Sequence, residues 1–158
     1  MLFRSDRSVA AGADVVKFQL RDMDALYRQS GGSSAGEDLG PQYVLDLLAK
    51  YNLSADQLFE VFDHCRAAGV EVMCTPWDPP SVQRLADYGI DAFKVASADM
   101  TNHALIRQMA AHDIPLVVST GMSHETEIKE TVALLQSLGA SYALLHCQST
   151  YPAPFKDI

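Results

Sequence analysis

The chain has 158 residues, 48% of them hydrophobic, and a formal net charge of −8 at pH 7. This length fits one domain with a sizeable core. The acidic balance and the lack of any Lys/Arg run argue against a general nucleic-acid binder, but a small anionic substrate could still bind where the few cations gather.

Five short apolar strands alternate with helices along the chain, after a first helix that ends before Gly12. Each strand runs into a polar cluster, and the strands with their clusters span residues 15–19, 72–76, 93–97, 117–122 and 144–149. Parallel strands are joined only by crossovers, so the alternation predicts a parallel α/β sheet. Ligands bind at the carboxyl ends of such strands, where the polar clusters would converge.

Local signals predict where the helices begin. Ser54 and Gln57 form a capping box, Pro79 opens the next helix, and Asn102 and Ser123 cap the two helices after it. The segment at residues 21–40 breaks the alternation, and its Gly/Ser-rich part at 30–36 is either a substrate loop or a disordered insertion.

Four strands follow similar turns, in which a helix end, a glycine and a small or apolar residue precede the strand. The four glycines are Gly12, Gly69, Gly89 and Gly139. This repeat indicates a radially repeated βα architecture, unless it reflects only that glycine often ends helices. Five strands do not close an eight-stranded barrel, and exposed parallel edges favour aggregation. We therefore favour part of a larger barrel over an open five-stranded sheet.

Two lysines, Lys17 and Lys94, lie in otherwise apolar strands. A lysine in a strand buried on both faces is unfavourable unless it meets an anion, which predicts a carboxylate or phosphate pocket. A Schiff-base lysine and a side chain that extends to the surface are the alternatives. By strand periodicity, Gln19 points to the same face as Lys17.

Further polar groups follow the later strands. Ser97 and Asp99 come just after Lys94; Asp99 is a candidate general base or hydroxyl-orienting group, or an Asx turn or helix cap. Ser119-Thr120-Gly121-Met122 places hydroxyls and backbone N–H groups before a helix, which suits an anion. His146 is expected to be a hydrogen-bonded core residue rather than a metal ligand. His64, His103 and His112 are expected to lie on the surface.

The cysteines Cys65, Cys74 and Cys147 are widely spaced and odd in number, which predicts free thiols in a reducing cytoplasm. The sequence shows no signal peptide and no apolar run of membrane-spanning length, and a cytoplasmic location is expected.

Taken together and in order, five motifs between residues 9 and 158 resemble the N-acetylneuraminate (sialic acid) synthase family, which includes the legionaminate and pseudaminate synthases. The motifs are Lys17-Phe18-Gln19, Cys74-Thr75-Pro76-Trp77-Asp78, Phe93-Lys94-Val95-Ala96-Ser97, Ser119-Thr120-Gly121-Met122 and His146-Cys147-Gln148-Ser149-Thr150-Tyr151-Pro152-Ala153-Pro154.

The resemblance implies a transferase of carbohydrate biosynthesis. Family members are (β/α)8 TIM-type barrels with a small antifreeze-like domain, and they form domain-swapped homodimers. They condense phosphoenolpyruvate with an N-acylated amino sugar, typically N-acetylmannosamine, using Mn²⁺ or Mg²⁺. Carbon 3 of phosphoenolpyruvate attacks the sugar aldehyde, water adds at carbon 2, and phosphate leaves by C–O cleavage.

The resemblance also assigns site residues. Those expected to bind the carboxylate and phosphate of phosphoenolpyruvate are Lys17, Thr75, Lys94, Ser97, Ser119 and Ser149. Tyr151 is expected near the sugar, and Gln19 and Asp99 are the candidate catalytic residues. Asp99 stands where better-known members carry Glu, after a Ser-Gly pair that is here Ser97-Ala98, and this leaves the amino sugar open.

By the same resemblance, residues 1–158 form a partial barrel domain with about strands 2 to 6 of eight. The first strand, the last two strands with two metal-binding histidines, and the C-terminal domain are not in this sequence. No metal ligand is therefore expected in the chain, and alone it is expected to be inactive. The rival interpretations are a 3-deoxy-sugar-acid synthase, a Schiff-base aldolase, and a non-catalytic truncated barrel that acts as an interaction module.

Overall fold

The computed structural model describes residues 2–26, 46, 48, 50–148, 150 and 152–157. Five parallel strands form one sheet in the order β1-β2-β3-β4-β5. The strands are β1 (Val15–Leu20), β2 (Glu71–Pro76), β3 (Ala92–Val95), β4 (Leu116–Ser119) and β5 (Tyr142–Leu145). Each crossover thus moves one strand onward in the same direction, as in a barrel and unlike a doubly wound sheet. The predicted parallel α/β class is confirmed.

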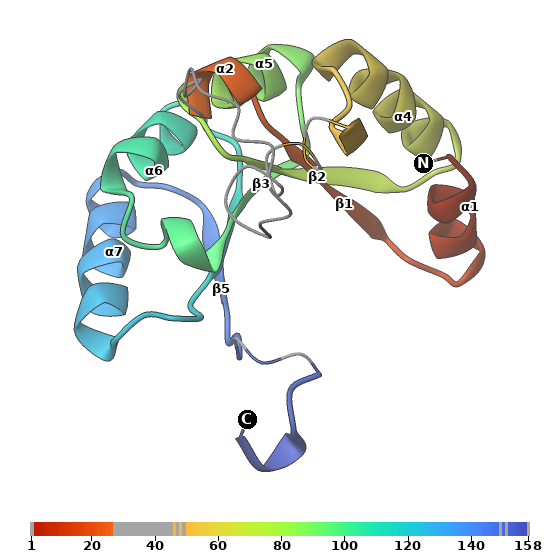
Figure 1. Ribbon diagram of the computed structural model, residues 1–158. Helices are drawn as coiled ribbons and strands as arrows, with labels where there is room; N and C mark the ends of the chain where they lie inside the picture. The colour runs from red at the N-terminus through yellow and green to blue at the C-terminus, as the bar shows by residue number, and fades with distance from the viewer. Residues whose placement is uncertain are drawn as a thin grey trace, which may run out of the picture.

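Helices lie between the strands in sequence, and four of them follow one another in an arc along the outer side of the curved sheet (Figure 1). These four are α4 (Ala55–Ala67), α5 (Pro79–Tyr88), α6 (His103–Ala110) and α7 (Glu125–Ser137). Helix α1 (Leu2–Ala10) packs against α4. The shorter elements are α2 (Met23–Leu26) and the 3₁₀ turns η1 (Ser97–Asp99) and η2 (Phe155–Asp157).

Three of the predicted helix starts are confirmed. The Ser54 hydroxyl accepts from the Gln57 backbone N–H at 3.2 Å, and the Gln57 side chain accepts from the Ser54 N–H at 3.1 Å. Helix α5 begins at Pro79, and the Asn102 side chain accepts from the Leu105 N–H at the start of α6. Caps of this kind satisfy N–H groups that have no partner within the helix.

The prediction that Ser123 caps the next helix is wrong. Helix α7 begins one residue later, after His124, whose backbone N–H donates to the Glu127 carboxylate at 2.7 Å. The Ser123 hydroxyl donates instead to the Gly121 carbonyl at 3.4 Å. The last strand also ends earlier than expected, at Leu145, because the polar residues after it belong to the loop.

The repeated turn before four strands is confirmed in the backbone. Its four glycines have φ values of 84° at Gly12, 84° at Gly69, 78° at Gly89 and 65° at Gly139. Glycine enters this left-handed region without a Cβ clash, which is why each helix can end and turn into its strand with only three or four residues between them.

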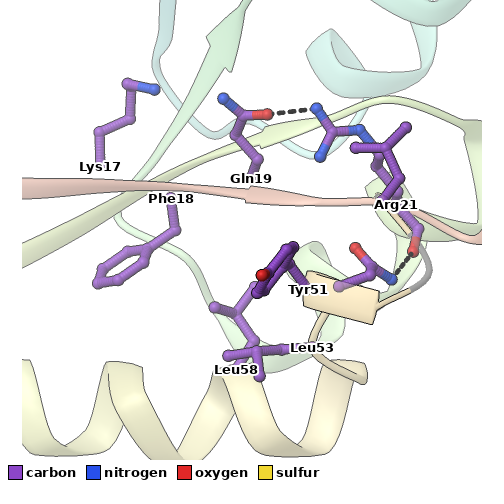
Figure 2. A pocket seen from close by; sticks show the side chains of 9 residues that line it. Lys17, Phe18, Gln19, Arg21, Tyr51, Leu53 and Leu58 are labelled. Carbon is purple, nitrogen blue, oxygen red and sulfur yellow. Dashed lines mark hydrogen bonds between the residues drawn. The ribbon is translucent and has the colours of Figure 1, made fainter. Parts of the chain in front are cut away.

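Strand β1 separates the polar site from the core. Lys17 and Gln19 project from one side of the strand, and Phe18 projects from the other, toward α4 (Figure 2). The Phe18 ring packs on Phe62 with centroids 5.1 Å apart. The side of β1 that carries Lys17 is exposed, so the expected burial of this lysine on both strand faces is wrong.

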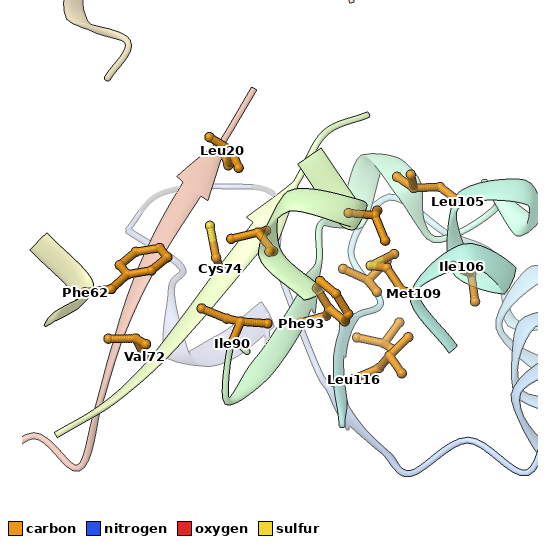
Figure 3. Close-up of a cluster of buried hydrophobic side chains, with 14 of the residues drawn as sticks. Leu20, Phe62, Val72, Cys74, Ile90, Phe93, Leu105, Ile106, Met109 and Leu116 are labelled. Carbon is orange, nitrogen blue, oxygen red and sulfur yellow. The ribbon is translucent and has the colours of Figure 1, made fainter. Parts of the chain in front are cut away.

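The hydrophobic core lies between the sheet and the outer helices (Figure 3). Val72, Phe93 and Leu116 face it from consecutive strands, and Ile106 and Met109 face it from α6; all five side chains are at most 1% exposed. This packing holds the strands side by side and so fixes the relative positions of the polar residues at their ends.

Candidate active site

The register brings the predicted polar residues onto one face of the sheet. Gln19 pairs with Thr75 across β1 and β2, and Cys74 pairs with Phe93 across β2 and β3. Continued by one residue, this register sets Thr75 beside Lys94. Partners in neighbouring parallel strands point to the same face, so residues from three strands form one row.

Lys94 is the buried cation of this row. It is 8% exposed, and its ammonium donates to the Val95 carbonyl at 2.6 Å and to the Ser119 hydroxyl at 2.5 Å. Burial lowers the pKa of Lys94, the Cys147 thiol raises it, and the positive charge of Lys17 lowers it further. A buried ammonium beside a second cation is stabilised when an anion binds. The anion pocket predicted for Lys94 therefore has a physical basis.

The electrostatic effect of Lys17 on Lys94 also bears on their placement. The charge of Lys17 acts on Lys94, and Lys17 acts in turn on the buried Cys74 thiol, whose pKa is raised chiefly by burial. Lys17 and Lys94 thus lie within electrostatic reach of each other. Lys17 is exposed and Lys94 is buried, so the positive charge of the site is divided between an exposed and a buried lysine.

Gly121 lies where loops of the site approach one another closely. A Cβ atom at this position would lie 2.8 Å from the Ser97 hydroxyl oxygen and 3.3 Å from the Cys147 Cβ atom. The loops after β3, β4 and β5 therefore touch here, and they do so only because residue 121 has no side chain. Ser97 is brought to the end of β4 as the sequence predicted.

The Ser119-Thr120-Gly121-Met122 junction differs from the predicted anion site in one respect. The Thr120 N–H and hydroxyl both bond to the Leu145 carbonyl, at 3.1 and 2.9 Å. Helix α7 starts only at Glu125, and its first turn carries two glutamates. One of them, Glu127, accepts from the His124 N–H at the N-terminus, and the other, Glu125, pairs with Lys129. Ser119, bonded to Lys94, is the hydroxyl that remains at the site.

Asp99 ends the η1 turn after β3. Its Oδ1 accepts from the Asn102 side-chain amide at 3.1 Å, which agrees with the predicted local turn contact. Its Oδ2 is buried and has no hydrogen-bond partner within the described part of the chain. A buried carboxylate oxygen without a donor is unfavourable, so a hydrogen bond from a substrate hydroxyl would stabilise this atom.

Arg21 is not among the predicted site residues, and it joins the site from the end of β1. Its guanidinium donates to Gln19 Oε1 and lies 4.8 Å above the centroid of the Trp77 ring. Gln19 also accepts from Trp77 Nε1 at 3.2 Å. Arg21 continues the two-residue period of Lys17 and Gln19, and this spacing could have indicated it. A cavity of about 380 Å³ runs along this end of β1.

Several other predicted residues are placed differently. His146 is exposed and not a core residue, since β5 ends before it. His103 is half-buried instead of on the surface, and its Nε2 lies 3.0 Å from the Thr131 hydroxyl. Ser149, Tyr151 and the 30–36 segment lie outside the described residues. The three cysteines are free thiols, as predicted.

Among the described residues, no group of three or more His, Cys, Asp or Glu side chains is arranged to hold a metal ion. These described residues therefore do not form a site for the Mn²⁺ or Mg²⁺ that the family resemblance implies. No helix in the described part of the chain is long and apolar enough to span a membrane.

The fold and the site define a class of protein: a barrel-type parallel α/β protein with a cationic site at the carboxyl ends of its strands. A model of the NeuB family matches residues 6–158. The chain therefore belongs to the NeuB family, the N-acetylneuraminate synthase family that its motifs resemble.

Individual relatives support this assignment. An uncharacterized protein of Methanocaldococcus jannaschii is 33% identical over 149 residues, which cover 93% of this chain and 41% of that protein. The N,N'-diacetyllegionaminic acid synthase of Legionella pneumophila is 28% identical over 158 residues, with 94% and 44% covered. This chain spans less than half the length of these relatives.

A solved structure supports the fold. The N-acetylneuraminic acid synthetase of Leptospira borgpetersenii, in complex with citrate, superposes with a TM-score of 0.85 at 23% identity, covering 99% of this chain and 51% of that one.

Proposed function

We propose that this chain supplies the phosphoenolpyruvate site of an enzyme that condenses phosphoenolpyruvate with an N-acylated amino sugar of the N-acetylmannosamine type. The products are a nonulosonic acid and phosphate. The observation that carries the proposal is the Lys94 ammonium, which is buried, bonded to Ser119 and close to a second cation, Lys17. A small, multiply charged anion is the ligand that this arrangement favours.

In this proposal the described residues have separate tasks. Lys94 and Lys17 hold the carboxylate and phosphate, and Ser97, Ser119 and Thr75 add hydroxyl donors. The free Oδ2 of Asp99 accepts a hydrogen bond from a hydroxyl of the sugar or from the water that adds to carbon 2. Desolvation at the end of the strands strengthens each of these contacts.

The proposal distinguishes binding from turnover. We expect the 158-residue chain to bind phosphoenolpyruvate but not to complete the reaction, because the relatives it matches are more than twice as long. The Mn²⁺ or Mg²⁺ requirement, the homodimer and the choice of amino sugar belong to the whole protein and remain proposals.

Two measurements test the function. Calorimetric titration of the chain with phosphoenolpyruvate is expected to give saturable 1:1 binding. With the whole protein, N-acetylmannosamine and phosphoenolpyruvate labelled with ¹⁸O at carbon 2, the label is expected in the released phosphate, since the C–O bond breaks. No binding, or label retained in the sugar acid, would overturn the proposal.

Burial lowers the pKa of Lys94, and this direction also favours a second candidate, a Schiff-base aldolase, because it raises the share of the amine that is neutral and nucleophilic. Borohydride reduction with pyruvate would then attach three carbons to Lys94 or Lys17. We expect no adduct by mass spectrometry, since the Lys94 ammonium is already bonded to Ser119 and Val95.

A further inference from the structure

The orientation of the Gln19 side-chain amide is fixed by its partners. Its Oε1 accepts from the Arg21 guanidinium at 2.5 Å and from Trp77 Nε1 at 3.2 Å. The two ends of an amide have the same shape, so only the hydrogen-bond partners tell them apart. A guanidinium and an indole N–H can only donate. The end that faces both of them must therefore be the oxygen.

The opposite end of the amide then faces the site. Figure 2 shows the Gln19 nitrogen directed toward the Lys17 side and the oxygen directed toward Arg21. Nε2 carries two N–H groups and accepts nothing. A ligand beside β1 consequently meets an ammonium from Lys17 and amide N–H donors from Gln19, and no acceptor from either side chain.

Arg21 and Trp77, which donate to the Gln19 oxygen, are themselves held in place. The Arg21 guanidinium stacks on the Trp77 ring, 4.8 Å from its centroid, and the Arg21 carbonyl accepts from the Asn52 side-chain amide at 3.3 Å. The next backbone N–H, of Asp22, donates at 2.8 Å to Asp78, which is 2% exposed and also caps α5. The Asp22–Asp78 hydrogen bond thereby joins the ends of β1 and β2. The positions of Arg21 and Trp77 therefore do not depend on a single exposed contact.

We infer that Arg21 and Trp77 are positioning residues that lock Gln19 as a hydrogen-bond donor to an anionic oxygen of the substrate. Unlocked, the amide could turn and present its oxygen, which would repel the same anion. Arg21 therefore acts through Gln19 and not by binding the substrate. This inference rests on the proposed function only in naming phosphoenolpyruvate as the anion.

The fixed orientation of the Gln19 amide, which we call the lock, is tested without any ligand. The chain has a single tryptophan, so its indole N–H gives one resolved NMR signal. We expect Gln19→Leu to move the indole proton upfield and speed its exchange with water, because the acceptor is lost. Gln19→Glu, which keeps acceptor oxygens, is expected to leave the proton downfield, and the exposed Arg107→Met is the neutral control. An unchanged indole signal in Gln19→Leu would overturn the inference.

The role of the lock is tested by phosphoenolpyruvate affinity in a double-mutant cycle. We expect Gln19→Leu and Arg21→Met each to weaken binding about tenfold, the loss of one charge-assisted hydrogen bond, and the double variant to bind no more weakly than Gln19→Leu. Arg21→Lys, which keeps a donor, is expected to recover part of the affinity.

The remaining outcomes separate the two claims. Losses that add in the double variant would mean that Arg21 binds the anion itself, which overturns the inference and leaves the proposed function standing. Wild-type chain that binds no phosphoenolpyruvate would overturn the proposed function and the identity of the ligand, while the indole signal would still decide whether the lock exists.

Discussion

At the residue scale, the site depends on one buried amine. Lys94 is almost fully buried, and its pKa is lowered first by that burial. A lowered pKa means that the folded chain binds fewer protons than the unfolded chain between the lowered value and 10.5, the ordinary value. Stability therefore rises with pH in that range, and at neutral pH the charged Lys94 opposes folding. Binding of an anion offsets this unfavourable contribution of Lys94 to the free energy of folding.

Replacement of Lys94 by methionine should thus separate binding from stability. We expect Lys94→Met to weaken phosphoenolpyruvate binding at least 100-fold, while the free energy of unfolding at pH 7 stays within about 1 kcal/mol of wild type, because an apolar isostere replaces a buried charge. Calorimetry and urea denaturation measure the two quantities. The control is Lys129→Met, which removes an exposed lysine paired with Glu125 on α7; equal loss of affinity in both variants would contradict a specific role.

The pH dependence of binding follows from the same amine. Phosphate monoesters lose their second proton at about pH 6, so above neutral pH only the protein titrates. The affinity of the wild-type chain should fall as pH rises through the lowered pKa of Lys94, beginning below 10.5. That step should be missing in Lys94→Met. An affinity that stays constant up to pH 10.5 would show that Lys94 does not hold the anion.

At the scale of elements, glycines are required for two different reasons. Gly139, between α7 and β5, has a φ of 65°, and a Cβ atom there would meet nothing within 4 Å. Gly121, after β4, lies where a Cβ atom would press on Ser97 at 2.8 Å. One glycine is required by the backbone and the other by the approach of a neighbouring loop.

These two glycines form a matched pair for mutation. Gly139→Ala should lower the free energy of unfolding by about 1 kcal/mol through the strained φ and leave phosphoenolpyruvate affinity unchanged. Gly121→Ala should weaken the affinity about tenfold, because Ser97 must move. Titration and denaturation of both variants check this. Similar affinities in the two variants would mean that Ser97 does not contact the ligand.

At the scale of the whole molecule, the sheet ends in two unpaired edge strands in the described part of the chain. Both carry exposed apolar side chains, with Val15 41% exposed on β1 and Leu144 42% exposed on β5. Edge strands present free N–H and C=O groups that pair with other chains unless charges block them.

The 158-residue chain should therefore self-associate as its concentration rises. We expect Leu144→Lys, which places a charge on the β5 edge, to shift the light-scattering mass toward the monomer. Leu138→Lys is the control, since Leu138 is equally exposed at 39% but lies at the end of α7 and not on an edge. A monomeric wild type, or an equal effect of both lysines, would rule out edge pairing.

The sequence by itself determined the features that depend on neighbours along the chain. Strand alternation, the capping box at Ser54 and the turn glycines are set by backbone geometry and local hydrogen bonds, so they could be predicted. The two-residue strand period also placed Lys17 and Gln19 on one face, and strand order placed Lys94 and Ser119 at one end of the sheet.

Only the tertiary structure decided the properties that arise between elements. The sequence pattern treated Lys17 and Lys94 alike, yet one is exposed and one is buried, because burial depends on which strands flank each. The contact of Gly121 with Ser97 and the lock on Gln19 by Arg21 and Trp77 join loops from different strands. Such contacts follow from sheet register and curvature, which the packing of the whole core sets.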